Sequence, residues 1–180
     1  TGWSVFAGVV AGLGAELCVT RGTPETTQLV RDIWPGASSS NPARIVRLGD
    51  RVVFAARDGS LGRELWISDG TALGTKQIKD IRPGVLSSGP RQLLSIGSKV
   101  VFTANDCTTG IEPWVTDGTS AGTKLVNDVQ PGSYGTQPTS FVRLGNRVCF
   151  RGGWGKTTPC TSGTSTSYRS TACFMNRTAV

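Results

Sequence analysis

The sequence predicts an all-β fold, namely a β-propeller-like array of four-stranded antiparallel blades with a 48-residue period. Three observations lead to this prediction. Short stretches of alternating apolar and polar residues are separated by turns, the 180-residue chain holds 24 Gly and 9 Pro but a single Met, and the same motifs return every 48 residues. Alternation with period two is typical of strands, and a meander repeated every roughly 40–50 residues is typical of propeller blades.

The period is read from the triplets Glu16-Leu17-Cys18, Glu64-Leu65-Trp66 and Glu112-Pro113-Trp114, from a Gly-Thr pair and from a Pro-Gly turn. These motifs begin at Glu16, Glu64 and Glu112, at Gly22, Gly70 and Gly118, and at Pro35, Pro83 and Pro131. No insertion or deletion separates the copies. We therefore divide residues 1–151 into a partial blade (1–36), two full blades (37–84 and 85–132) and a partial blade (133–151).

The unit that spans residues 85–132 illustrates the expected blade. Alternating runs at 92–96, 99–104, 112–116 and 124–129 predict its four strands, and Gly97-Ser98, Asp117-Gly118 and Pro131-Gly132 break them. Tight turns between short strands produce an antiparallel meander and exclude a parallel α/β sheet. A β-sandwich and a β-solenoid are the alternatives that the same strands could build.

One position of the third strand carries Trp66 and Trp114 in the two full blades and Cys18 in the first. A large ring at this position can fill the gap between neighbouring sheets, so we predict an interblade anchor, with Cys18 as a smaller plug. A platform on which a sugar ring stacks is the alternative.

The acidic residues of each unit are predicted to shape its turns. Asp69-Gly70 and Asp117-Gly118 offer a side-chain acceptor followed by a residue that tolerates positive φ, as a tight hairpin requires. Asp80 and Asp128, like Asp32, precede Pro-Gly turns, where a carboxylate can accept backbone N–H bonds. No cofactor is expected. Calcium is the one metal considered, and one Asp per loop is a thin supply of oxygen ligands for it.

Residues 64–84, ELWISDGTALGTKQIKDIRPG, and 112–132, EPWVTDGTSAGTKLVNDVQPG, resemble the ELWxxDGT repeat family. The resemblance covers roughly residues 3–151. The family occurs in secreted and surface proteins, chiefly bacterial, so the resemblance implies a secreted, extracellular or cell-surface location. It offers no catalytic residues to carry over. The first unit departs from the pattern, because Cys18 replaces the Trp and Arg21 replaces the hairpin Asp.

Beyond residue 151 the pattern fails. Residues 152–180 are predicted to be a degenerate blade or a tail rich in Ser, Thr and Gly, and Asn176 begins an N-glycosylation sequon.

The five cysteines contain no CxxC pair, and their odd number leaves at least one thiol unpaired within the chain. The secure strands make about three and a quarter blades, whereas closed rings have about four to eight. The expected partners are therefore further blades or further copies, which would complete a ring or form a filament.

For function, the sequence favours a non-catalytic extracellular repeat module for binding, adhesion or structural assembly, with a carbohydrate or a surface protein as ligand. The loops at 57–63 and 105–111 and the Pro-Gly loops are its predicted binding rim. No enzyme is expected, since His, GxSxG and a Walker loop are all missing from the sequence.

Two alternatives remain open. A propeller enzyme acting on polysaccharides would use paired acids, although Glu16, Glu64 and Glu112 recur too regularly for a catalytic pair. A binder of anionic polymers would use the net charge of +7, although nucleic acid is not expected because aromatic residues rarely interleave with the basic ones. No membrane span is expected, since no apolar run approaches the roughly 18–20 residues required.

Overall fold

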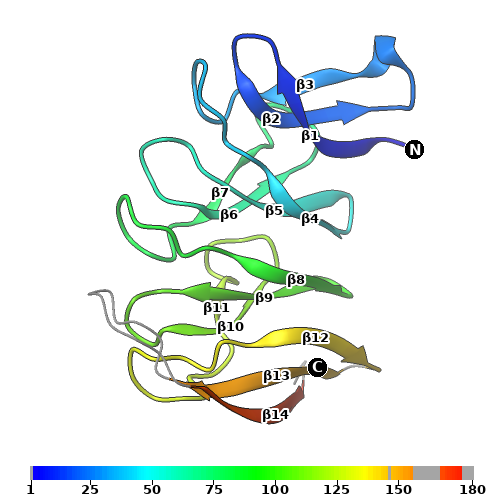
Figure 1. Ribbon diagram of the computed structural model, residues 1–180. Coiled ribbons are helices and arrows are strands. Elements are labelled where there is room, and N and C mark those ends of the chain that lie inside the picture. Colours follow the sequence, from blue (N-terminus) through cyan, green and yellow to red (C-terminus); the bar gives the residue numbers. More distant parts are fainter. Residues whose placement is uncertain (1, 146, 156–166, 176–180) are drawn as a thin grey trace.

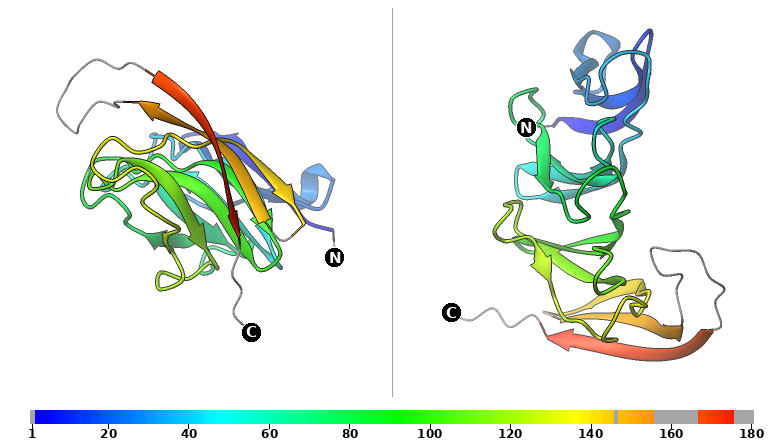
Figure 2. Two further views of the ribbon diagram at one scale, coloured as in Figure 1. Left: turned by 90° about the horizontal axis from the view of Figure 1, so that it is seen from below. Right: turned by 90° about the vertical axis from the view of Figure 1, so that its left-hand side faces the viewer.

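The computed structural model of the protein describes residues 2–145, 147–155 and 167–175. Four antiparallel sheets lie one above another in a single column, with the N-terminal sheet at one end and the C-terminal sheet at the other (Figure 1). The right-hand view in Figure 2 shows the same succession of sheets from the side. The predicted all-β, antiparallel architecture is confirmed.

The strands follow the chain from one sheet to the next. The first sheet holds β1 (Ser4–Val10), β2 (Gly14–Thr20) and β3 (Gln28–Arg31), with the 3-10 turn η1 (Pro24–Thr26) before β3. The second holds β4 (Ala43–Leu48), β5 (Arg51–Ala56), β6 (Glu64–Ser68) and β7 (Lys76–Lys79). The third holds β8 (Arg91–Ile96), β9 (Lys99–Asn105), β10 (Ile111–Thr116) and β11 (Lys124–Leu125). The fourth holds β12 (Thr139–Leu144), β13 (Arg147–Gly155) and β14 (Ser167–Met175).

In the part of the chain that the structure describes, each end sheet has three strands, and the strand it lacks differs between the two. In the first sheet Phe6 pairs with Cys18, as Phe54 pairs with Trp66 in the second, so β1–β3 correspond to the last three strands of a full sheet. In the fourth sheet the hairpin from β12 to β13 begins like that from β4 to β5, so β12–β14 correspond to the first three. The strand β14 lies in the segment predicted as a degenerate blade or a tail.

The fourth strand of the third sheet is shorter than predicted. The alternation at 124–129 predicted a strand of six residues, but β11 ends at Leu125. The carbonyl of Pro113 accepts from the N–H of Val126 at 2.9 Å, so residue 113 faces β11. Because proline has no N–H, the return bond that a residue at this position would donate is missing, and the ladder stops.

Apolar side chains fill each junction between sheets. Leu17, Val19 and Val30 of the first sheet pack against Phe54 and Trp66 of the second. The junction of the second and third sheets contains Leu48, Val53, Leu65, Ile67, Ile78, Ile81, Val100, Phe102, Ala104 and Trp114. The junction of the third and fourth contains Ile96, Val101 and Val148. Both faces of each inner sheet are therefore buried, which explains strands such as β5 and β6 that are buried along almost their whole length.

Candidate ligand-binding groove

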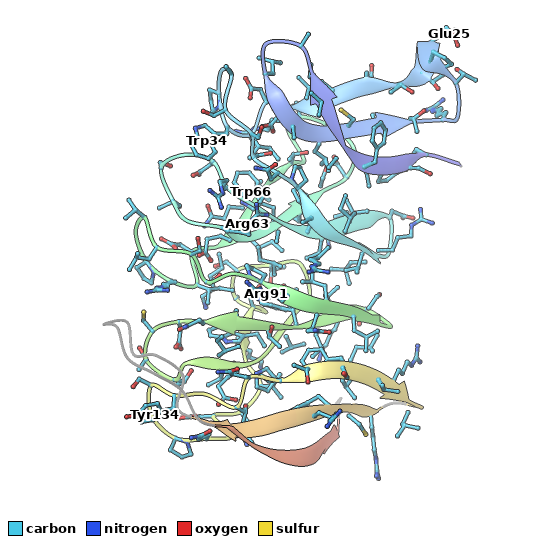
Figure 3. The ribbon with its side chains drawn as sticks, in the orientation of Figure 1. Glu25, Trp34, Arg63, Trp66, Arg91 and Tyr134 are labelled. Carbon is cyan, nitrogen blue, oxygen red and sulfur yellow. The ribbon has the colours of Figure 1, made fainter. Side chains whose placement is uncertain are left out.

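The position predicted as an interblade anchor lies at the sheet junctions. Trp66 is 5% exposed and packs on the first sheet, where Figure 3 shows it, and Trp114 is 6% exposed and packs on the second. Cys18 is buried too, but its neighbours Leu17 and Val19 face the second sheet, so alternation directs Cys18 to the opposite, outer face. Its thiol is free, and burial raises its pKa.

The Asp-Gly hairpins close on themselves through their own side chains. Asp69 Oδ1 accepts from the N–H and the hydroxyl of Thr71 at 2.9 and 2.7 Å, and these bonds lower the pKa of Asp69. Asp117 is held in the same way by Thr119, with the same effect on its pKa. Gly70 and Gly118, which follow the aspartates, both have φ of +90°. These carboxylates are engaged within the turn.

The aspartates before the Pro-Gly turns are held less completely. Asp80 Oδ2 accepts from the N–H of Gly84 at 3.2 Å, and Asp32 Oδ2 accepts from that of Gly36 at 3.1 Å. The Oδ1 atoms of Asp32, Asp80 and Asp128 are buried without a hydrogen-bond partner. Among the described residues no three His, Cys, Asp or Glu side chains gather into a group able to hold a metal ion.

A buried glutamate clamps the loop that joins each sheet to the next, a role that the sequence did not reveal. Glu64 Oε1 accepts from the N–H of Ser88 at 2.6 Å, and Oε2 accepts from the Ser88 hydroxyl at 2.6 Å and the N–H of Ile81 at 3.1 Å. Glu16 holds Ser40 and Ile33 in the same way. Charge-assisted bonds of this kind fix the entry and the exit of the loop.

The third clamp completes the series. Glu112 accepts from the N–H of Thr136 at 2.8 Å, from its hydroxyl, and from the N–H of Gln130 at 3.3 Å. All three glutamates are 0% exposed. The recurring Ser or Thr, 24 residues after each Glu, is the sequence signal that could have indicated the clamp. The carboxylates considered for an enzyme are thus buried and engaged by the backbone.

Burial raises the pKa of Glu64 and Glu112 despite these hydrogen bonds. As pH rises, these two glutamates lose their protons first in the unfolded chain, near the ordinary glutamate pKa of about 4.3. Between that value and the raised pKa the folded state binds more protons, so stability falls as pH rises. We expect the free energy of unfolding, measured by urea titration, to decrease over this window, and a Glu64→Gln variant to show a smaller decrease. A dependence on pH equal to that of the unsubstituted protein would contradict this assignment.

The predicted loop rim is tied together by its own contacts. Arg63 Nη1 donates to the carbonyls of Asn41 and Ala55 at 2.8 and 3.2 Å, and burial is the main cause of a lowered pKa for Arg63. The guanidinium of Arg57 lies 6.0 Å from the centre of the Trp34 ring. Figure 3 places Trp34, Arg63 and Tyr134 along this edge of the column. Arg63 is thus engaged by backbone carbonyls, and Arg57 lies beside the Trp34 ring.

The first strands of three successive sheets form a different surface. β4 lies next to β8, and β8 next to β12, across the second, third and fourth sheets (Figure 1). Each has a register shift near its start, and an exposed non-glycine residue adopts positive φ there: Arg44 at 59°, Gln92 at 55° and Ser140 at 56°. Such a conformation is uncommon for residues other than glycine and is a strained state that recurs at functional sites.

A hollow of about 260 Å³ lies along these strands. Its lining residues are Arg44, Ile45, Val46, Gln92, Leu93, Leu94 and Phe141. Ile45, Leu93 and Phe141 are half-buried and each packs at a different sheet junction, whereas Arg44 and Gln92 are exposed. We call this surface the first-strand groove. A second hollow of about 240 Å³ shares Ile45 and Val46 with it and extends toward Trp3.

Cations gather around the first-strand groove. The first strands with their following turns, residues 43–51, 91–99 and 139–147, carry seven Arg or Lys residues and one acid, Asp50. Arg51 lies near Asp69 and Lys99 near Asp117, which lowers the pKa of both aspartates further. The exposed Arg44, Arg47, Arg91 and Arg143 have no ion pair among the described residues. These arginines lie on the first strands of three stacked sheets, so they place positive charge on each of the three.

The sequence scatters these residues singly, so the groove was not predicted. Arg44, Arg91 and Arg143 are about one unit apart along the chain, and only the stacking of the sheets brings them to one surface. The positive φ of Arg44, Gln92 and Ser140 could not be predicted either, because Arg, Gln and Ser rarely adopt this conformation. Two other predictions concern the cysteines and the glycosylation sequon. Cys107 and Cys149 are each disulfide-bonded, whereas Asn176 lies outside the described residues.

Comparisons with known proteins give a likeness of fold. No family model and no curated protein matches the chain. A solved structure from a study of two prolyl endopeptidases, which concerns inter-domain dynamics in catalysis and specificity, matches 90% of this chain with a TM-score of 0.52 and 14% identity. A structure of a puromycin hydrolase mutant matches 77% of it with a TM-score of 0.30 and 13% identity.

The chain covers 24% and 29% of the lengths of those two proteins. Because the sequence identity is only 14%, the first match shows a similar fold and nothing about function. Within the described residues, no helix has the length and apolar character that crossing a membrane would need. The fold and the first comparison together show an all-β, propeller-like succession of antiparallel sheets.

Proposed function

We propose that this protein is a non-catalytic extracellular module that binds an acidic polysaccharide along the first-strand groove. The observation that carries the proposal is the row of strained residues Arg44, Gln92 and Ser140 beside half-buried apolar side chains and exposed arginines. A linear polymer with acidic groups can lie across successive strands, with its sugar rings on Ile45, Leu93 and Phe141. Guanidinium groups bind carboxylates and sulfates in bidentate fashion, which gives the arginines a role that lysines would fill less well.

The unit of this module is proposed to be the 48-residue ELWxxDGT-type blade. Support comes from the three glutamate clamps and from the matching hydrogen bonds of Asp69 and Asp117, which recur at that spacing. Each blade then contributes one first strand to the groove. The length of polymer that is bound would grow with the number of stacked blades.

Secretion is supported by the disulfides. Cys107 and Cys149 are both oxidised, and structural disulfides persist in oxidising compartments such as the cell exterior. Polysaccharides are the abundant polyanions of that environment, whereas nucleic acid is mostly intracellular. This argument separates the proposed ligand from nucleic acid, which would be attracted by the same arginines.

The test uses heparin as an acidic probe. Each arginine is replaced by the residue found 48 positions away in the sequence, at the equivalent position of a neighbouring sheet. Arg44→Gln, Arg91→Thr and Arg143→Ser copy Gln92, Thr139 and Ser95. We expect each single change to weaken heparin binding about five-fold, on the order of 1 kcal/mol, and the triple variant to lose nearly all of it. Calorimetric titration at low and moderate salt measures the affinity and its salt dependence.

A matched control removes the same charge elsewhere. Arg21→Gln, Lys76→Gln and Lys124→Gln change exposed cations in the turn between β2 and β3 and on the strands β7 and β11. Binding by this triple variant should remain within two-fold or so of the original, because the field at the groove is largely unchanged. Equal losses in both triple variants would reject a specific groove. Tighter binding of single-stranded DNA than of heparin would favour the nucleic-acid alternative.

A further inference from the structure

The two ends of the column expose faces that the inner sheets bury. Leu144 of the fourth sheet is 61% exposed, whereas Leu48 and Ile96, which precede the same turn in the second and third sheets, are 4% and 9% exposed. Val142 is 54% exposed, although Val46 and Leu94 pack at sheet junctions. The outer face of the fourth sheet therefore has the apolar pattern of a junction, and no described residues form a sheet that covers it.

The outer face of the first sheet is the complementary half of such a junction. Phe6 is 37% exposed, whereas Phe54 and Phe102, its counterparts opposite Trp66 and Trp114, are fully buried. Cys18 stands beside it in place of the tryptophan. This face is apolar like those of the inner sheets, but the smaller side chain leaves more room.

An inner junction shows how the two halves engage. The side chains of Leu48 and Ile67 fill the space beside Gly118, since a Cβ there would lie 3.1 Å from Leu48 Cδ2 and 2.8 Å from Ile67 Cδ1. The missing side chain of the glycine thus forms a slot for the leucine of the preceding sheet. Gly22 stands in the corresponding hairpin of the first sheet, and nothing lies within 4 Å of a Cβ built on it.

We propose that copies of this chain stack head to tail, with Leu144 and Val142 of one copy against Phe6 and Gly22 of the next. Both halves of the contact are present on one chain, at opposite ends of the column, and each repeats a pattern that the inner junctions already use. A contact between two different faces leaves a free face at each end of the assembly. Stacking therefore continues until the copies form a filament or close into a ring.

The test measures mass in solution by analytical ultracentrifugation over a wide range of concentration. The unsubstituted protein is expected to associate progressively, and Leu144→Asp or Phe6→Asp should each weaken association about thirty-fold or more, because a charge would be buried at the contact. Leu73→Asp is the matched control, since Leu73 is 97% exposed in a hairpin of the second sheet. It should leave association unchanged.

Mixing the two variants distinguishes head-to-tail stacking from symmetric contacts. Each variant retains one intact face, so an equal mixture should form a dimer of one copy of each, while either variant alone stays monomeric. A mixture that remains monomeric would overturn the proposal, as would an unsubstituted protein that is monomeric at every concentration. These outcomes do not depend on polysaccharide binding, which is measured on the monomeric variants.

Discussion

Replacing Glu64 by alanine is expected to lower the free energy of unfolding by about 3–5 kcal/mol. The change removes three hydrogen bonds to a fully buried carboxylate and leaves the N–H groups of Ile81 and Ser88 without an acceptor. A buried donor that loses its partner costs about 1–3 kcal/mol, and bonds to a charged group are the stronger ones. Urea denaturation followed by circular dichroism measures the loss.

Two further variants make this result interpretable. Glu64→Gln keeps the shape but presents an amide N–H₂ to one donor of the loop, so we expect an intermediate loss of about 2 kcal/mol. Glu25→Ala removes an exposed glutamate in η1 and should leave the free energy of unfolding nearly unchanged. If Glu64→Ala were as mild as Glu25→Ala, the carboxylate would not be a clamp.

Replacing Trp114 by alanine is the second change with a large expected effect, a loss of about 3–5 kcal/mol. The ring is 6% exposed among Leu65, Ile67 and Phe102, and its removal leaves a cavity between two sheets that are both built of packed strands. Lys79 Nζ lies 6.0 Å from the ring centre and donates to the Thr123 carbonyl at 3.0 Å, so a cation–π contact is lost as well.

Cys18 provides the comparison within the same chain. It occupies the same place opposite a phenylalanine, but on the outer face of the first sheet and with a much smaller side chain. Cys18→Ala should therefore cost about 1 kcal/mol or less. Thermal unfolding of both variants checks the contrast, and comparable losses would mean that the tryptophan is not an anchor between sheets.

How far the sequence predicts this molecule depends on whether a feature is local. Alternation and turn residues predicted the strands of the third sheet to within a residue or two, except for β11, where Pro113 on the neighbouring strand removes a donor. That cause lies in another part of the sheet, so the alternation at 124–129 could not indicate it. The antiparallel pairing followed from the short turns.

The proposed binding surface depends on relations between units, which the sequence does not display. Glu64 reaches a serine 24 residues later, and Arg44 and Arg91 come together only when successive sheets stack. At the register shifts, the residue types predict negative φ, because arginine and glutamine rarely adopt the positive φ that Arg44 and Gln92 have. The loops at 57–63 and 105–111 were predicted as the binding rim because loops carry function in many folds, a general tendency that takes no account of how these loops are held.

Hydrogen exchange with and without heparin tests the central claim most directly, because it reports the position of the ligand along the backbone. Bound heparin is expected to slow exchange in residues 43–48, 91–96 and 139–144, the first strands that form the groove. Exchange in the loops at 57–63 and 105–111 should be unchanged. Slower exchange confined to those loops, with the first strands unaffected, would contradict the groove and restore the rim predicted from the sequence.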